Sequence, residues 1–360
     1  MNFSNIAKEL SNSNLSKVIN VSQHNREAEV LFSINMNKEE INKNKKSIFF
    51  NKEFKNIFII HNSTNYGHVS NQINGTGVKK IELEKFKSAG VDELSDLFQD
   101  SAIMMTNNLF AQIGIDKLST IYEKIPNSIW VIQDYDNHHW IENSIQASIF
   151  ADIYFPAHMD GEIILFTKIN PNVPFFLPCG SNQWSKSFID SHQDDLIKVS
   201  RQSEPLGKYY FYEKFIHRNK VINSLNKAYQ SIGIVGNDFH QRSEIEKWNE
   251  WIGHRYHWII PTANDLPIRF FDALITGGIP IIPKTLIPYL GFLKIPETFY
   301  KTFSSLDIFE PDSFINHLNK TSEINCSEYI MERHQFALKY FHVDAILSKA
   351  IDTTKSYYCA

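Results

Sequence analysis

The chain has 360 residues, of which 42% are hydrophobic and 21% charged, and its net charge at pH 7 is −4. This ordinary composition has no basic excess, which argues against a nucleic-acid partner. The three scattered cysteines, Cys179, Cys326 and Cys359, and an N-terminus without an apolar core predict a cytoplasmic protein without a disulfide framework or a secretory signal.

The first half alternates apolar runs with longer mixed segments. Residues 1–29 are polar, and the charged run 38–46 is expected to be a solvated loop. Strands are predicted at 56–60, 102–105, 129–132, 152–155 and 162–166, and helices at 113–125 and 142–151. This alternation of strands and helices favours an α/β domain.

Pro171, Pro174, Pro178 and Gly180 interrupt the alternation, which places a domain boundary here. We expect domains at 1–177 and 178–330, followed by a C-terminal helical segment at 331–360. Beyond the boundary, strands are predicted at 208–212, 231–235, 258–260 and 279–282, and helices at 215–230, 243–253, 266–276, 312–319 and 328–351.

The segment His257–Pro283 has the order strand, loop, helix, Gly-Gly, strand. In parallel sheets crossed by helices, ligands bind beyond the carboxyl ends of the strands. An acid such as Asp265, which precedes the helix, can accept there from ribose hydroxyls, and a helix start can bind phosphate. A surface pair of Arg269 with Asp272 is the alternative. Gly277 and Gly278 form either a helix C-cap or a close approach to a nucleotide.

A second polar segment, Asp134 to His139, follows the predicted strand 129–132. A carboxylate or imidazole at a strand end can take the proton of a sugar acceptor hydroxyl, which makes Asp134, Asp136, His138 and His139 catalytic candidates. The same groups can instead ligate a divalent metal, or the segment can be a plain polar connection.

A third segment, His61 to His68, follows the predicted strand 56–60. Here Tyr66 and His68 are candidates for lining an acceptor cleft, because Gly67 allows a substrate to approach closely. The alternative is a simple turn at the end of a strand.

Residues 267–283, PIRFFDALITGGIPIIP, resemble the nucleotide-sugar-binding signature of GT-B glycosyltransferases, of the type that builds bacterial surface glycans. Two further segments agree with this resemblance. Residues 177–182, LPCGSN, resemble the Pro-x-Gly segment that opens the second domain of that family, and residues 215–222, FIHRNKVI, resemble its Arg-bearing helix start. The resemblance is good over 177–283 and only architectural over the first half.

The resemblance implies an α/β fold with two Rossmann-like domains that face each other across a cleft, and a C-terminal helix that crosses back to the first domain. The first domain would bind the acceptor and the second the donor. Asp272 would bind the ribose, and Gly277 and Gly278 would form the turn after it. The remaining donor-site residues implied are Arg218, Lys220, Asn237, Asp265 and Arg269. No metal or cofactor is expected, because basic side chains and a helix N-terminus can stabilise the leaving diphosphate.

The expected function is transfer of a sugar from a nucleotide-sugar to a glycan or glycolipid acceptor in polysaccharide biosynthesis. An acceptor on a lipid carrier would bring the protein to the inner face of the membrane. Two alternatives stay open: a metal-dependent transferase or hydrolase built on Asp134, Asp136, His138 and His139, and a non-catalytic nucleotide- or glycan-binding module. Retaining members often carry two glutamates separated by seven residues. Here Asp272 stands eight places after Asn264 and seven after Asp265, so the stereochemical outcome is also open.

Overall fold

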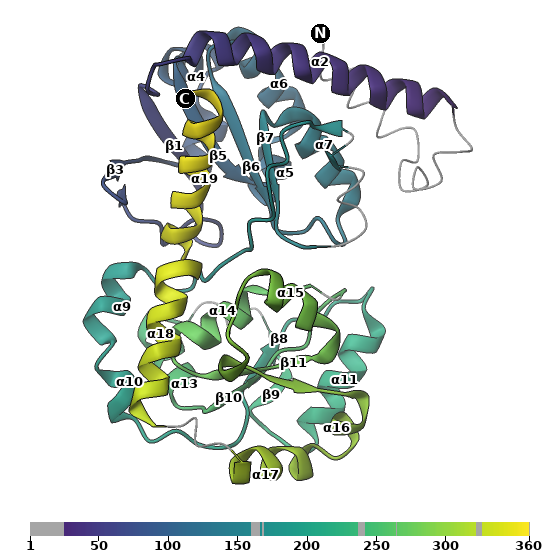
Figure 1. The fold of residues 1–360 in the computed structure, drawn as a ribbon, viewed down its shortest axis with the longest axis vertical. Coiled ribbons are helices and arrows are strands. Elements are labelled where there is room, and N and C mark those ends of the chain that lie inside the picture. The colour runs from purple at the N-terminus through teal and green to yellow at the C-terminus, as the bar shows by residue number, and fades with distance from the viewer. Residues whose placement is uncertain are drawn as a thin grey trace. The chain divides into compact units, whose positions relative to one another are not determined.

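The computed structural model describes residues 25–159, 166–167, 169–236, 242–263, 265–321 and 326–359 (Figure 1). The chain forms two compact units, an N-terminal unit of residues 1–179 and 346–360 and a C-terminal unit of residues 180–345. Most of the strand expected at 162–166, and most of the polar segment 1–29, lie outside the described residues.

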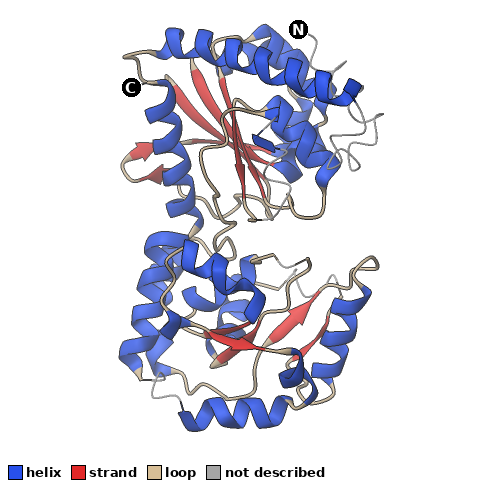
Figure 2. Ribbon diagram, turned by 45° about the vertical axis from the view of Figure 1, so that its right-hand side comes forward, coloured by secondary structure: helices blue, strands red, loops and turns tan. Residues whose placement is uncertain are grey.

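The N-terminal unit is built on a five-stranded parallel sheet of order β4-β1-β5-β6-β7 (Figure 2). The strands are β1 (Asn56–His61), β4 (Lys79–Glu82), β5 (Ser101–Thr106), β6 (Ile129–Asp134) and β7 (Ile153–Pro156). All residues of β5, β6 and β7 are buried. Strands covered on both faces are expected to be largely apolar. For this reason the apolar runs in the sequence predicted the positions of these three strands.

Helices lie on both sides of this sheet (Figure 2). They are α3 (Leu83–Ser88), α4 (Val91–Phe98), α5 (Asn107–Ile113), α6 (Ile115–Lys124), α7 (Ile141–Phe150) and α19 (Val343–Tyr358). The helix expected at 113–125 begins two residues late, at Ile115, because Gly114, at φ +90°, separates α5 from α6. A hairpin of β2 (Gln72–Ile73) and β3 (Thr76–Gly77) contacts α19, since Asn74 donates to the Ser348 hydroxyl at 2.7 Å.

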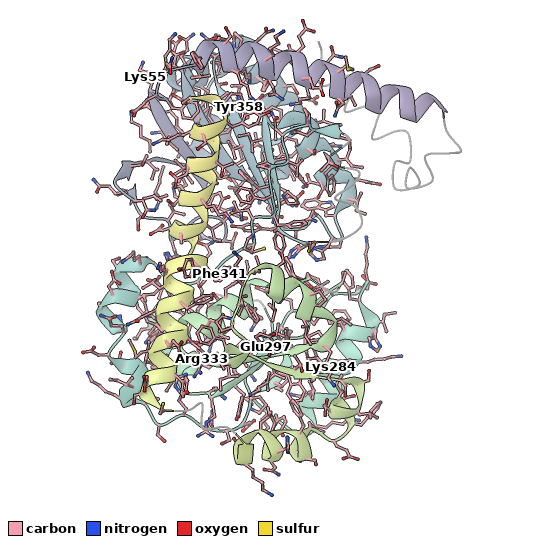
Figure 3. All side chains as sticks on the ribbon, viewed as in Figure 1. Lys55, Lys284, Glu297, Arg333, Phe341 and Tyr358 are labelled. Carbon is pink, nitrogen blue, oxygen red and sulfur yellow. The ribbon has the colours of Figure 1, made fainter. Side chains whose placement is uncertain are left out.

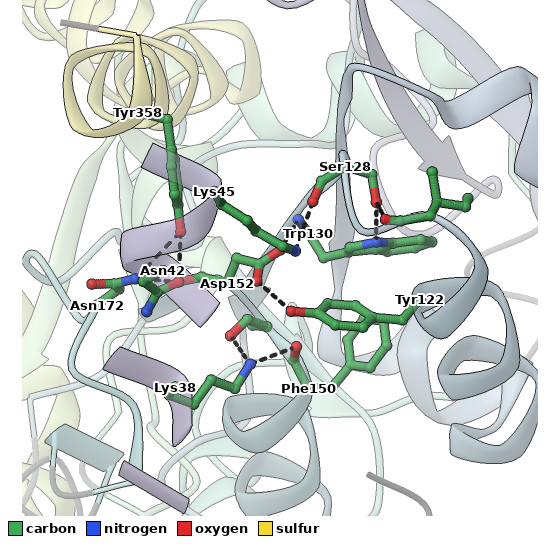
Figure 4. Close-up of polar contacts among 12 residues, drawn as sticks. Lys38, Asn42, Lys45, Tyr122, Ser128, Trp130, Phe150, Asp152, Asn172 and Tyr358 are labelled. Carbon is green, nitrogen blue, oxygen red and sulfur yellow. Dashed lines mark hydrogen bonds and ion pairs between the residues drawn. The ribbon is translucent and has the colours of Figure 1, made fainter. Parts of the chain in front are cut away.

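The solvated loop expected at 38–46 is wrong, because this segment lies inside α2 (Asn25–Phe49). Lys38 is buried and donates to the carbonyl oxygens of Phe150 and Ala151 at 2.9 and 2.8 Å. Lys45 lies further along the same face of α2 and forms a buried ion pair of 2.6 Å with Asp152 (Figure 4). Burial lowers the pKa of Lys38 to about 7. Charges that find such partners are compatible with a buried helix face.

The C-terminal unit contains the parallel pair β8 (Gly207–Tyr209) and β9 (Ile232–Ile234), and the parallel sheet of β10 (Tyr256–Trp258), β11 (Ile279–Pro283) and β12 (Lys301–Phe303). A parallel bridge between Leu206 and His257 joins β8 to β10. The strands therefore follow the order β9-β8-β10-β11-β12, and the direction of winding reverses between β8 and β10. Such a switch point opens a crevice at the carboxyl ends of its strands.

The helices of this unit are α9 (Lys186–His192), α10 (Asp195–Lys198), α11 (Ile216–Asn226), α13 (Glu244–Ile252), α14 (Ile268–Ile275), α15 (Ile287–Phe292), α16 (Ser305–Phe309), α17 (Pro311–Thr321) and α18 (Ser327–Phe341), with short 3-10 turns η2 (Lys284–Leu286) and η3 (Glu297–Phe299). The single helix expected at 328–351 is two, α18 and α19, because His342 is extended between them. The α/β fold class with parallel sheets is confirmed. No helix in the described ranges is both long and apolar enough to cross a membrane.

Candidate functional site

A cavity of about 690 Å³ opens at the carboxyl ends of β10, β11 and β12, next to the start of α11. Four cationic or titratable side chains line it, Lys214, His217, Arg218 and Lys284, and the described lining residues include no carboxylate. Its other walls are apolar side chains and hydroxyls: Phe215, Ile216, Val221, Ile260, Pro261, Thr262, Pro283, Thr285, Phe303, Ser304, Ser305 and Ile308. In a chain of net charge −4, this is a local concentration of positive charge.

Arg218 is the buried cation of this cavity. It is 8% exposed, and its guanidinium packs 5.0 and 5.1 Å from the ring centres of Tyr209 and Tyr212. One terminal nitrogen donates to the Tyr210 carbonyl at 2.9 Å, while the buried Nε has no acceptor among the described residues. Burial lowers the pKa of Arg218 from its ordinary value. A buried guanidinium with an unused donor is suited to an anionic ligand.

The start of α11 adds to the positive field. Ile216, His217 and Arg218 are its first three residues, and all three line the cavity. The first N–H groups of a helix have no acceptor within the helix and carry the positive end of its dipole. Phosphate groups bind at such positions. Lys214 and Lys284 lie on the rim with exposed side chains, and Figure 3 labels Lys284 in the segment after β11.

Arg269, a residue of α14, also reaches this region. Its guanidinium lies 5.0 Å from the Tyr209 ring centre, so Arg218 and Arg269 pack on the same tyrosine. Asp265 is buried and accepts from the backbone N–H groups of Thr262 and Ala263, which closes the loop after β10. The structure thus gathers three of the expected donor-site residues around the ends of β8 and β10.

Two other expected donor residues are not in this group. Lys220 is exposed on α11 and does not line the cavity. Asn237 lies outside the described residues.

Asp272 lies inside the C-terminal unit, 2% exposed, on the buried side of α14. The Ser181 hydroxyl donates to its Oδ1 at 2.6 Å. Burial raises the pKa of Asp272 to about 7, against the opposing effects of the Ser181 hydrogen bond and Arg269. Asp272 does not line the cavity, so a ribose would have to reach it by another route or displace the Ser181 hydroxyl.

Gly277 and Gly278 end α14 in a Schellman motif. Gly277, at φ +66°, donates to the Leu274 carbonyl at 2.9 Å, and Gly278 donates to the Ala273 carbonyl at 2.8 Å. A Cβ at Gly277 would meet Ile330 at 2.6 Å, and a Cβ at Gly278 would meet the His257 ring at 2.4 Å. Protein atoms therefore fill the space beside both glycines, which supports the C-cap interpretation over close approach to a nucleotide.

In the N-terminal unit, Asp134 is a buried structural carboxylate. It accepts from the Tyr154 hydroxyl at 2.5 Å and from the Asp136 backbone N–H at 2.9 Å. Burial raises its pKa to about 7. Because its side chain is 0% exposed, it has no surface on which to meet a substrate hydroxyl or a metal ion.

Asp136, His138 and His139 do come together, at the carboxyl end of β6. The Asp136 side chain is 22% exposed, and its Oδ1 lies 3.7 Å from Nε2 of His139, which is 33% exposed. His139 Nδ1 lies 2.8 Å from Nε2 of His138. Burial lowers the pKa of His138 to about 2, so His138 is neutral at physiological pH. The accessible pair in this cluster is Asp136 with His139.

Of the two residues expected to line an acceptor cleft, Tyr66 is buried and His68 is half-buried. The Tyr66 hydroxyl donates to the Gln133 side chain at 2.7 Å, and burial raises its pKa. Gln133 in turn donates to the carbonyls of Leu177 and Pro178 at 3.1 and 2.8 Å. In this arrangement Tyr66 supports the loop after β1 from inside the unit.

The sequence interpretation missed Lys214, His217 and Lys284 as partners of Arg218, and Asn107 and Asn108 as partners of Asp136. A usable signal was present, because each lies within a few residues of the end of a predicted strand, as parallel-sheet ligands do. Asn108 and Asp136 are 28 positions apart in the sequence, and such distant segments cannot be joined on that signal without the strand order.

No protein-family model and no curated protein matches the chain. Solved structures that it resembles include a sucrose-phosphate synthase from Thermosynechococcus elongatus, at 11% identity and TM-score 0.44 over 79% of this chain and 82% of that one. TarM matches at 11% identity and TM-score 0.43, over 73% of this chain and 57% of that one. The catalytic domain of starch synthase IV from Arabidopsis thaliana, bound to ADP and acarbose, matches at 11% identity and TM-score 0.44, over 77% of this chain and 76% of that one.

Proposed function

We propose that this protein is a glycosyltransferase that moves a sugar from a nucleotide-sugar donor to a hydroxyl of a glycan or glycolipid acceptor. The observation that carries the proposal is the cavity of the C-terminal unit, where four basic side chains and a helix start meet apolar walls without a carboxylate among the described lining residues. A nucleoside diphosphate has the matching chemistry, with an anionic diphosphate and a flat, largely apolar base.

The diphosphate would bind at the positive end of the cavity. Arg218 would donate from its unused Nε, and Lys214 and Lys284 would neutralise charge from the rim. During transfer the same groups would stabilise the diphosphate as it leaves, a role that basic side chains and helix dipoles can fill without a metal. Cavities of about 300–1,000 Å³ are usual for ligands of this size. Asp272 is proposed as the ribose ligand on the family resemblance alone.

The acceptor would bind at the N-terminal unit, at the carboxyl ends of β5 and β6. The sugar hydroxyl has to lose a proton as it attacks, and a carboxylate or imidazole within hydrogen-bond reach supplies that function. Asp136 and His139 are the accessible candidates. If the acceptor is carried on a lipid, the protein would work at a membrane surface.

The test is a thermal-shift panel of UDP, GDP, ADP, TDP and CMP, each with and without manganese. Binding to the folded state raises the melting temperature by mass action. We expect one nucleoside diphosphate to raise it at millimolar concentration, equally with and without the metal. Matching nucleotide sugars are then assayed for release of that diphosphate. A panel without any shift would overturn the proposal, and a shift that requires manganese would favour a metal-dependent enzyme.

A further inference from the structure

Two amide side chains donate hydrogen bonds to the carboxylate of Asp136. Asn107 and Asn108, the first two residues of α5, donate to the same carboxylate oxygen, Oδ2, at 3.0 and 2.8 Å. Asn107 is buried, and its own side-chain oxygen accepts from the Tyr135 N–H at 3.0 Å. Two amides at one helix start therefore fix the direction in which the Asp136 carboxylate points.

The second oxygen of Asp136 faces an imidazole across a gap. Its Oδ1 lies 3.7 Å from Nε2 of His139, which is too long for a direct hydrogen bond. An oxygen atom beside the gap can reach both groups at ordinary hydrogen-bond distances. His138 holds the far side of the His139 ring, at 2.8 Å from Nδ1, and its low pKa of about 2 keeps it neutral.

The chemistry of the two sides of the gap selects its occupant. A carboxylate oxygen accepts hydrogen bonds, and a ring nitrogen that carries a proton donates one. A neutral hydroxyl satisfies both, since it accepts from Nε2 and donates to Oδ1. A phosphate or carboxylate acceptor would bring a second negative charge beside Asp136.

We propose that Asn107 and Asn108 are positioning residues that aim Oδ1 of Asp136 at a neutral acceptor hydroxyl, which His139 holds from the other side. This proposal rests on the proposed glycosyl transfer and assigns the base to Asp136. The hydroxyl oxygen forms its bond to C1 of the sugar as its proton passes to Oδ1 of Asp136. The bond from C1 to the diphosphate oxygen breaks, and its electron pair leaves with the diphosphate.

A crystal structure of the unliganded full chain tests the geometry, with water as the probe for the hydroxyl. We expect an ordered water within hydrogen-bond distance of both Oδ1 of Asp136 and Nε2 of His139. Asn108→Ala should turn the carboxylate and remove this water, whereas Asn71→Ala, at an exposed asparagine of the same unit, should keep it. A direct contact between Asp136 and His139 without water, or an unmoved carboxylate in Asn108→Ala, would overturn the proposal.

Kinetics then separate positioning from folding. With a donor that the wild type turns over, Asn108→Ala should lower kcat by about tenfold or more and change KM for the donor less than twofold. Equal kcat in the wild type and Asn108→Ala would refute the positioning role. If the wild type turns over no donor, the proposed function fails instead, and the bridging water still decides the geometry.

Discussion

The Ser181 hydroxyl donates a hydrogen bond of 2.6 Å to Oδ1 of Asp272 inside the C-terminal unit. Ser181 is also paired through its backbone with the junction of α18 and α19, since its N–H donates to the Phe341 carbonyl at 2.7 Å and its carbonyl accepts from Val343 at 2.9 Å. Phe341, labelled in Figure 3, stacks on Phe271 at 5.0 Å between ring centres. The acid expected to bind ribose is therefore bonded to the segment with which this unit begins.

Ser181→Ala and Asp272→Ala should differ in what they change. Removing the Ser181 hydroxyl leaves a buried carboxylate with one donor fewer, which should lower the free energy of unfolding by about 1–3 kcal/mol. Because the carboxylate stays, nucleotide affinity should change less than about threefold. Asp272→Ala should weaken nucleotide binding about tenfold or more, if Asp272 holds the ribose. Urea unfolding and calorimetry measure the two effects, and unchanged binding in Asp272→Ala would leave Asp272 a purely structural role.

Arg218→Ala should weaken the binding of a nucleoside diphosphate by about 10- to 100-fold. A charge-assisted hydrogen bond contributes about 1.5–3 kcal/mol, and about 1.4 kcal/mol corresponds to tenfold in affinity. Lys220→Ala is the matched control, because Lys220 is a cation of the same helix that lies outside the cavity lining, and its variant should bind within about twofold of the wild type. Isothermal titration with both variants decides this, and equal losses would show a general field effect in place of a specific site.

The free energy of unfolding should fall as pH rises from about 4 to about 7, because of the raised pKa of Asp134. Burial raises the pKa of this carboxyl from 3.8 to about 7, so the folded protein keeps its proton to higher pH than the unfolded chain does. Its contribution is complete below about pH 4 and is lost as pH rises towards about 7. Asp134→Asn is neutral at every pH and should flatten this part of the curve of melting temperature against pH. The exposed control Asp96→Asn should leave the slope unchanged, and an equally steep slope in Asp134→Asn would contradict the assignment.

Gly278→Ala should destabilise the fold without altering nucleotide binding by the folded protein. The added Cβ would lie 2.4 Å from the buried His257 ring, and overpacking of this kind costs about 1–3 kcal/mol. Gly291→Ala is the control, since a Cβ there meets nothing within 4 Å. Urea unfolding measures the loss, and calorimetry at a temperature where both variants are folded measures the binding. A loss of affinity with normal stability would restore the nucleotide-contact role of the glycine turn.

The strands that the sequence located are those covered on both faces. Continuous apolar runs such as Ile129–Ile132 give a signal that needs no partner. The edge strands β4 and β12, with sequences KKIE and KTF, have no such run and were missed. Edge strands commonly carry charge, which removes the periodic signal.

The sequence by itself determined the α/β alternation and the strand–loop–helix–strand unit at His257–Pro283, because these depend on local periodicity and on glycines that end a helix. Only the tertiary structure decided which polar groups are buried and paired. Lys38 meets the Phe150 carbonyl across 112 positions, and Ser181 meets Asp272 across 91. The tertiary structure also brought together the four chain segments that line the cavity, within 214–221, 260–262, 283–285 and 303–308, and left Lys220 outside the lining. The physical reason is that a charged side chain is stable in a core or on a surface according to its partners, and partners distant in sequence are supplied by strand order and helix packing.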